Sequence, residues 1–148
     1  MTLDRGYIGE NEAALHRLRR LVERLGDDEL ARPLADGWTV AAALAHVAFW
    51  DQRILFLLDR WERGEPPRPI DPASVDWINE AAKPLCLALA PRPAARLAVA
   101  TAEAVDRRLA QLTDAQLREN AAAGEPILLV RARHRAAHLD EIERGLGR

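Results

Sequence analysis

The sequence predicts an all-α protein, an antiparallel four-helix bundle with a short accessory helix, built as a single domain over residues 1–148. Four long segments carry apolar residues at helical spacing. The stretches between them are rich in Pro, Gly and Asp, which interrupt regular structure. No segment shows the alternation of a β-strand. A chain of this length supports one sizeable core, whereas two separate cores would each be smaller than a usual domain.

The first two predicted helices lie in the N-terminal half of the chain. Residues 10–25 place their apolar side chains on one stripe, and Gly26 supplies a stop. The second helix spans residues 39–63, with Thr39 as N-cap, and Gly64 opens the sequence GEPPRP that ends it. Because this helix is apolar on most of its circumference, we expect it to pack on two sides, either inside the bundle or between the bundle and a partner subunit.

The accessory helix begins at Asp71, where Asp followed by Pro72 has the pattern of an N-cap and a first helical residue. Its apolar residues continue to Ala82, and Pro84 should kink or end it. A third long helix is predicted over residues 93–112, where apolar residues recur at alternating spacings of three and four, the pattern of a bundle seam.

Two further elements close the chain. Thr113 and Gln116 have the spacing of a capping box, which predicts one helical turn. The last long helix is predicted to begin at Pro126 and to end near Gly145. Short connections between long helices favour antiparallel neighbours.

Composition and charge exclude several classes of protein. Lys and Arg total 21 against 23 Asp and Glu, so the formal charge is -2 and no broad basic field exists for nucleic acid. Cys86 is the only cysteine, which excludes an intrachain disulfide and fits a small apolar filler in a reducing compartment. No segment reaches the roughly 18 consecutive apolar residues of a membrane span, and the N-terminal segment lacks a signal-peptide core. We therefore expect a cytoplasmic protein that binds neither nucleic acid nor membrane.

His134 and His138 form the strongest local signal for chemistry. Residues four apart on a helix share a face and can ligate the same ion. The same face is expected to carry Ile127, Val130, Ala137 and Glu141. That face is the predicted core side, and buried imidazoles are costly unless each nitrogen finds a partner. A bound cation would resolve the conflict; the alternative is a pair of core histidines that bond to their neighbours.

His46 adds a third imidazole from the second helix, where its neighbours are apolar. Taken alone, it is also explained as a satisfied core residue. Together, three histidines on two neighbouring helices form a site for one divalent ion, with coordination positions left open for water or substrate. Zn, Ni, Fe and Mn all suit such ligands.

Glu141 lies one turn beyond His138 and is our candidate catalytic residue, as a general base, a fourth ligand or a carboxylate bonded to an imidazole. The alternative is a surface carboxylate at a helix end. Asp51 projects to a different side of its helix, so we assign it to packing or a surface ion pair, and His16 is expected in solvent. Four tryptophans are expected to line a pocket near the site or to pack in the core or a dimer interface: Trp38, Trp50, Trp61 and Trp77.

The chain resembles the DinB-like metal-binding superfamily in WTV (38–40), in LAHVAFWD (44–51) and in the closing HxxxH (134–138). The segments VDWIN (75–79) and LTDAQL (112–117) extend the resemblance over nearly the whole chain. It implies a four-helix bundle, often a homodimer, with one metal held by His46, His134 and His138. Relatives include bacillithiol and glutathione S-transferases, the mycothiol-dependent maleylpyruvate isomerase and a group that detoxifies reactive electrophiles.

Three hypotheses of function follow. In the first, the protein is an enzyme, a thiol transferase or hydrolase whose metal activates a low-molecular-weight thiol cosubstrate or water to attack a small electrophile. In the second, it is a non-enzymatic metal-binding module with a stress-response or structural role. In the third, it is a helical dimer whose histidines satisfy one another. An enzyme requires an open site beside a ligand-sized cavity, whereas a structural ion should be closed off.

Overall fold

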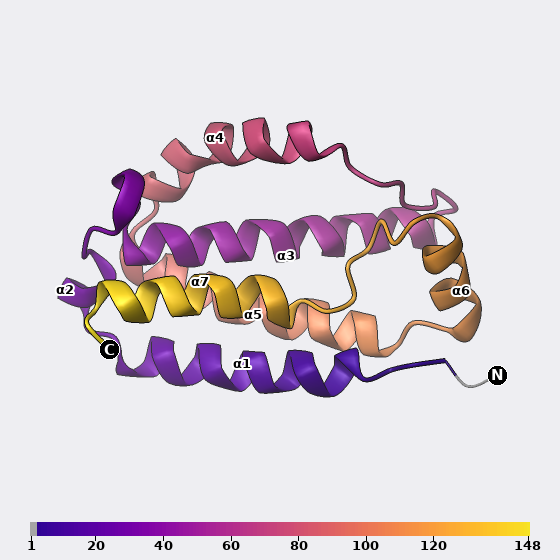
Figure 1. The fold of residues 1–148 in the computed structure, drawn as a ribbon, viewed down its shortest axis with the longest axis horizontal. Helices are drawn as coiled ribbons and strands as arrows, with labels where there is room; N and C mark the ends of the chain where they lie inside the picture. The colour runs from indigo at the N-terminus through magenta and orange to yellow at the C-terminus, as the bar shows by residue number, and fades with distance from the viewer. Residues whose placement is uncertain (1–2) are drawn as a thin grey trace.

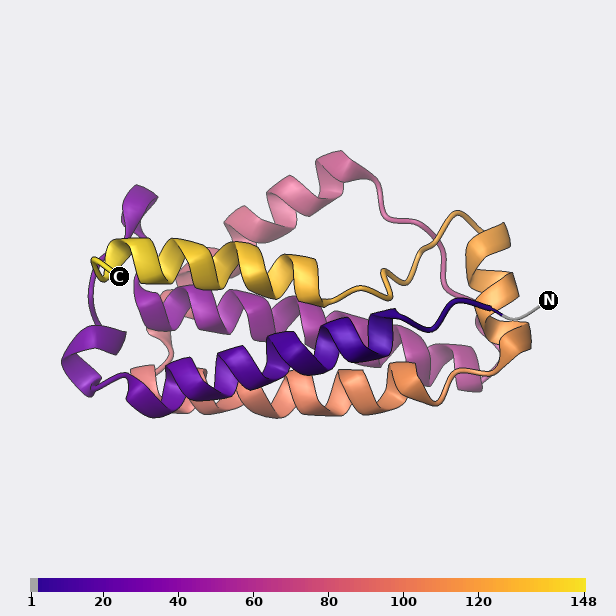
Figure 2. The same ribbon diagram turned by 60° about the horizontal axis from the view of Figure 1, so that its bottom comes forward.

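The computed structural model describes residues 3–148, and this part of the chain contains seven α-helices, one 3-10 helix and no β-sheet. The predicted all-α class is confirmed. Four long helices lie side by side, and a fifth crosses above them (Figures 1 and 2). The long helices are α1 (Tyr7–Arg24), α3 (Val40–Glu62), α5 (Pro91–Ala110) and α7 (Ala132–Gly145). The others are α2 (Asp27–Leu30), the 3-10 helix η1 (Ala35–Gly37), α4 (Pro72–Ala88) and α6 (Asp114–Ala122).

The long helices have both parallel and antiparallel neighbours. The final turns of α3 and α5 meet where Arg108 donates to Glu62 at 2.9 Å, so these two helices run in the same direction. Likewise, α1 and α7 run in the same direction: Asn11 near the start of α1 accepts from the N–H of Ala132 at the start of α7, and Arg24 at the end of α1 lies 4.0 Å from Glu143 in the last turn of α7. The cause is α4, which carries the chain back along the bundle between α3 and α5 (Figure 1). Purely antiparallel packing between consecutive long helices is therefore not what the structure shows.

Several predicted helix starts are confirmed by their caps. The Thr39 hydroxyl accepts a hydrogen bond from the backbone N–H of Ala42 at 3.1 Å, which starts α3. Thr113 and Gln116 form the predicted reciprocal capping box. The helix that follows, however, has nine residues rather than one turn.

The accessory helix is longer than predicted. Asp71 caps it and Pro72 occupies its first turn as expected, but α4 continues past Pro84 to Ala88. A proline inside a helix leaves the carbonyl four residues earlier without its usual donor. That carbonyl belongs to Glu80, an exposed residue, so water can satisfy it.

The last helix begins at Ala132, so the prediction that it starts at Pro126 is wrong. Two buried amides explain the difference. Asn120 bonds both the N–H and the carbonyl of Ile127, at 3.0 and 2.9 Å. Asn11 accepts from the N–H of Ala132 at 2.9 Å and donates to the carbonyl of Leu129 at 2.8 Å. Because side chains satisfy these backbone groups, the segment before Ala132 stays out of the helix.

Small residues let α3 and α5 pack closely in the half of the bundle that contains the histidines. Alanines from both helices fill this core, as expected for α5 from its small residues. The predicted role of Cys86 as an apolar filler agrees with its burial in the same cluster. Among residues 3–148, α3 is the helix with the length and apolar character to cross a membrane. Most of it is buried inside the bundle, as in the core helix of a soluble protein.

Candidate metal centre

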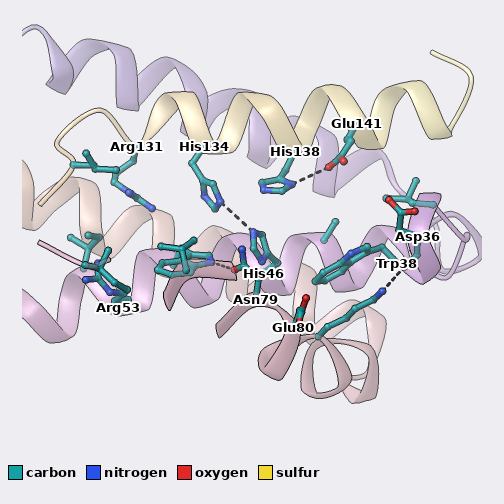
Figure 3. Close-up of a pocket in the computed structure, with 18 of the residues that line it drawn as sticks. Asp36, Trp38, His46, Arg53, Asn79, Glu80, Arg131, His134, His138 and Glu141 are labelled. Carbon is teal, nitrogen blue, oxygen red and sulfur yellow. Dashed lines mark hydrogen bonds and ion pairs between the residues drawn. The ribbon is translucent and has the colours of Figure 1, made fainter. Parts of the chain in front are cut away.

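His46, His134 and His138 meet between α3 and α7 (Figure 3). One ring nitrogen from each histidine lies within 4.8 Å of the other two. The Nε2 atoms of His46 and His134 are 3.4 Å apart, and the His46 and His138 ring centroids are 4.6 Å apart. The structure therefore brings together the three residues predicted as ligands, in an arrangement that could hold a metal ion.

The histidines of α7 face a cavity rather than the apolar core. The core side of this helix carries Arg135, Leu139 and Ile142, which are all buried. Ala137 and Glu141 are exposed, so the prediction that their face is the core side is wrong. The reason is Arg135, a charged residue that occupies the buried face of α7. Its ion pairs with Asp51 and Asp106 stabilise it there, although the sequence pattern predicted apolar residues on the buried face.

A cavity of about 1260 Å³ opens beside the three imidazoles. It lies between α3, α4 and α7, and it is large enough for a small organic ligand. Trp38 and Trp50 line it as predicted, and the Trp38 ring meets the edge of His46 at a centroid distance of 5.6 Å. Trp61 packs instead with Leu58 and Leu109 in a separate part of the core, and Trp77 is 59% exposed outside the cavity lining.

Burial keeps two of the imidazoles neutral. It lowers the pKa of His46 to about 4, with a smaller contribution from the charge of His138. It also lowers the pKa of His134 to about 3, with further contributions from His138 and Arg131. Neutral imidazoles carry the lone pair that a metal requires, so this donor set fits a divalent ion of the Zn, Ni, Fe or Mn type. Nδ1 of His134, the nitrogen that points away from His46, is buried and has no hydrogen-bond partner among residues 3–148.

Glu141 contacts the outer nitrogen of His138. Its carboxylate lies 3.0 Å from Nδ1, while 54% of its side chain is exposed. A carboxylate at Nδ1 fixes the tautomer that leaves Nε2 free to bind a metal. Of the three roles considered for Glu141, this geometry supports the carboxylate bonded to an imidazole, and its catalytic role stays a prediction.

A buried ion network lies behind the histidines, and the sequence prediction missed it. Asp51 is completely buried, so the assignment to a surface ion pair is wrong. Its carboxylate accepts from Arg131 at 2.9 Å and from Arg135 at 3.3 Å. Arg135, also completely buried, pairs with Asp106 at 2.7 Å. The sequence did contain a signal for this network: Asp51 lies in the middle of a helix that is apolar on most sides. A carboxylate that is buried in such a helix requires a cationic partner.

The fold and the site together define a helical protein with three histidines at the wall of a ligand-sized cavity. A family model described as the DinB superfamily matches residues 10–142. The chain therefore belongs to the DinB superfamily, as its sequence motifs predicted. No curated protein and no solved structure matches the sequence.

Proposed function

We propose that the protein is a metal-dependent enzyme that adds a low-molecular-weight thiol of the mycothiol or bacillithiol type, or water, to a small electrophile. The observation that carries this proposal is the position of the three histidines at the wall of a 1260 Å³ cavity. An ion with a purely structural role is normally enclosed by its ligands. Here, 23% of the His138 side chain is exposed, which leaves room for an exogenous ligand beside it.

The residues of the site have complementary roles in this proposal. A divalent ion at the three imidazoles would lower the pKa of a thiol or water bound to it and so supply a nucleophile at neutral pH. His46 and His134 stay neutral because they are buried. Glu141 orients His138 and, from its exposed position, can accept a proton at the mouth of the cavity. Trp38 and Trp50 provide apolar walls for the electrophile.

The alternative is a non-enzymatic metal-binding module with a stress-response or structural role. Its support is that the three histidines join α3 to α7, so an ion bound there would stabilise the bundle. The two functions differ in their response to added thiols and electrophiles, since only the enzyme converts them.

The first experiment is elemental analysis of untagged protein purified without chelators, together with His46→Ala and His138→Ala variants. His16→Ala is the matched control, because His16 is exposed on α1 and does not line the cavity. Near-stoichiometric metal in the wild type and the control, but not in the site variants, would support the centre. Thiol transfer to common electrophiles is then compared in metal-loaded and chelator-treated protein. The absence of any metal-dependent rate, with any thiol or with water, would refute the enzymatic proposal.

We also propose that the protein forms a homodimer. Phe49 and Phe56 lie seven residues apart on α3 and are 39% and 52% exposed, so this helix retains an apolar face outside the bundle. Light scattering after gel filtration tests this: a monomeric mass at micromolar concentration would refute it.

A further inference from the structure

Two arginines line one end of the cavity, beside the histidines. Arg53 follows His46 by seven residues on α3, which places it two turns further along the same helix face. Arg131 precedes His134 by three residues at the start of α7. Both line the cavity, and Figure 3 shows them together at one end of it, with the histidines between them and the opposite end.

Arg131 is held rigidly with part of its guanidinium free. The residue is only 5% exposed, and its Nε donates to Asp51 at 2.9 Å. Arg135 donates to the other oxygen of Asp51, which fixes that carboxylate in turn. Within residues 3–148, the two terminal Nη atoms of Arg131 have no hydrogen-bond partner. Because this side chain borders the cavity, those donors are available to a ligand.

Arg53 is the second cation at this end of the cavity. Unlike Arg131, it has no acidic partner in the described part of the chain. Its guanidinium lies over the ring of Trp50, 5.7 Å from the centroid, and Trp50 is itself held by a 2.8 Å hydrogen bond to Asn79. Burial, and then the positive charge of Arg131, lower the pKa of Arg53. Asp51 and Asp106 balance the charges of Arg131 and Arg135, so the charge of Arg53 is left unmatched.

No acidic side chain of the cavity lining pairs with Arg53 in the described residues, and most of the acids lie away from it. Asp36 and Glu141 are placed further from the two arginines than the histidines are, and Glu80 lies beside the histidines (Figure 3). Glu125 also lines the cavity, and no ion pair joins it to either arginine in residues 3–148. Lys83, which bonds the backbone carbonyl of Asp36, and Arg144 also line the cavity, so the part away from Arg53 and Arg131 carries charges of both signs. Arg53 and Arg131 are thus a pair of cations at one end of the cavity, beside the candidate metal centre.

We propose that Arg53 and Arg131 form a subsite for a carboxylate group on the ligand that reacts at the histidines. Guanidinium groups bind planar carboxylates through paired, charge-assisted hydrogen bonds. Binding such a group neutralises the unmatched charge of Arg53, and the adjacent Trp50 ring accommodates an apolar body. The helical rise from His46 to Arg53 is about 10 Å, so the carboxylate and the reactive atom belong to one small molecule or to two bound side by side.

This inference rests on the proposed function for the identity of the reacting partner, but its binding test does not require turnover. The probes are benzoate and its neutral analogue benzamide, titrated by calorimetry into the full-length chain, both metal-loaded and chelator-treated. Wild type is compared with Arg53→Gln and Arg53→Lys. Arg96→Gln is the matched control, since Arg96 is exposed on α5 and lies outside the cavity lining.

We expect benzoate to bind the wild type and the Arg96→Gln variant equally, in both metal states, and benzamide to bind much more weakly. Loss of one charge-assisted contact in Arg53→Gln should weaken benzoate binding about tenfold, with partial recovery in Arg53→Lys. Equal benzoate affinity in wild type and Arg53→Gln, or equal affinity for benzoate and benzamide, would overturn the proposal.

A competition titration distinguishes the two molecules that can carry the carboxylate. Displacement of benzoate by S-methylbacillithiol, which carries carboxylates on its malate group, assigns the subsite to a thiol cosubstrate of the bacillithiol type, and failure to displace it assigns the subsite to the electrophile. Arg53-dependent benzoate binding without any thiol-transfer activity would retain the subsite and reject the proposed function. Thiol transfer by the wild type, with unchanged benzoate affinity in Arg53→Gln, would reject the subsite and retain the proposed function.

Discussion

Replacing Arg135 with methionine should destabilise the metal-free protein by about 3–5 kcal/mol at neutral pH, the usual cost of removing one partner from a buried ion pair. Arg135 is completely buried and pairs with Asp106 at 2.7 Å and Asp51 at 3.3 Å. Methionine fills much of the volume but donates no hydrogen bond, so the two carboxylates lose their shared cation. Because a domain is typically stable by only about 5–15 kcal/mol, this loss should be unmistakable.

The assay is urea unfolding of chelator-treated protein, monitored by circular dichroism, at pH 7.5 and pH 5. Burial already raises the pKa of Asp106, and removal of Arg135 should raise it further. The variant then takes up a proton as the pH falls, so the difference from wild type should shrink at pH 5. Arg133→Met is the matched control, because Arg133 is exposed on the same helix. A destabilisation by Arg135→Met of less than about 1 kcal/mol, or no larger than that of the control, would refute the reasoning.

Three further predictions concern the site and its supports. Glu141→Gln should weaken metal binding about tenfold, because it removes the negative charge next to Nδ1 of His138. A competition titration with a chromophoric chelator measures the metal affinity. An unchanged affinity would mean that Glu141 is only a surface carboxylate. The metal-free protein should lose stability as the pH falls below about 6.5 toward 4, because the unfolded chain protonates His46 and His134 in that range while the folded chain, with pKa values of about 4 and 3, does not. At pH 5 the free energy of unfolding should fall by up to about 2 kcal/mol for each histidine, relative to a variant with glutamine at both positions. If the stabilities of the two proteins, measured by urea unfolding, changed in parallel with pH, the prediction would be wrong. Asn120→Ala should lower the free energy of unfolding by about 2–3 kcal/mol, because it leaves the buried N–H and carbonyl of Ile127 unpaired. Urea unfolding measures this loss. A loss of less than about 0.5 kcal/mol would mean that the connection to α7 does not depend on this amide.

The sequence predicted the helices best where local signals act alone. Thr39, Asp71 and Thr113 each start a helix through contacts within three residues, so their caps could be identified from the sequence. The start of α7 depends instead on Asn11, more than a hundred residues away, and no local pattern reveals that contact. The reversal of direction by α4 is also a tertiary effect, since loop composition does not specify where the chain returns.

The candidate site shows the same limit. The three histidines were identifiable because two of them are four residues apart on one helix and the third lies in an apolar helix, and the structure brings them together. Arg53 and Arg131 were not identifiable, because arginine is abundant in this chain and either residue resembles a surface charge in the sequence. Their significance comes from burial and from the pairing of Asp51, which depend on how α3 and α7 pack.

His46 and His134 are 88 residues apart in the chain, although their ring nitrogens nearly touch. An ion shared between them would close a loop of this length in the manner of a removable cross-link. The chain-entropy model for disulfides gives about 4–5 kcal/mol for a loop of similar size. Because the ion dissociates when the chain unfolds, the apparent melting temperature would rise with free metal concentration. Two preparations of the same sequence would therefore differ in stability whenever they differ in metal content.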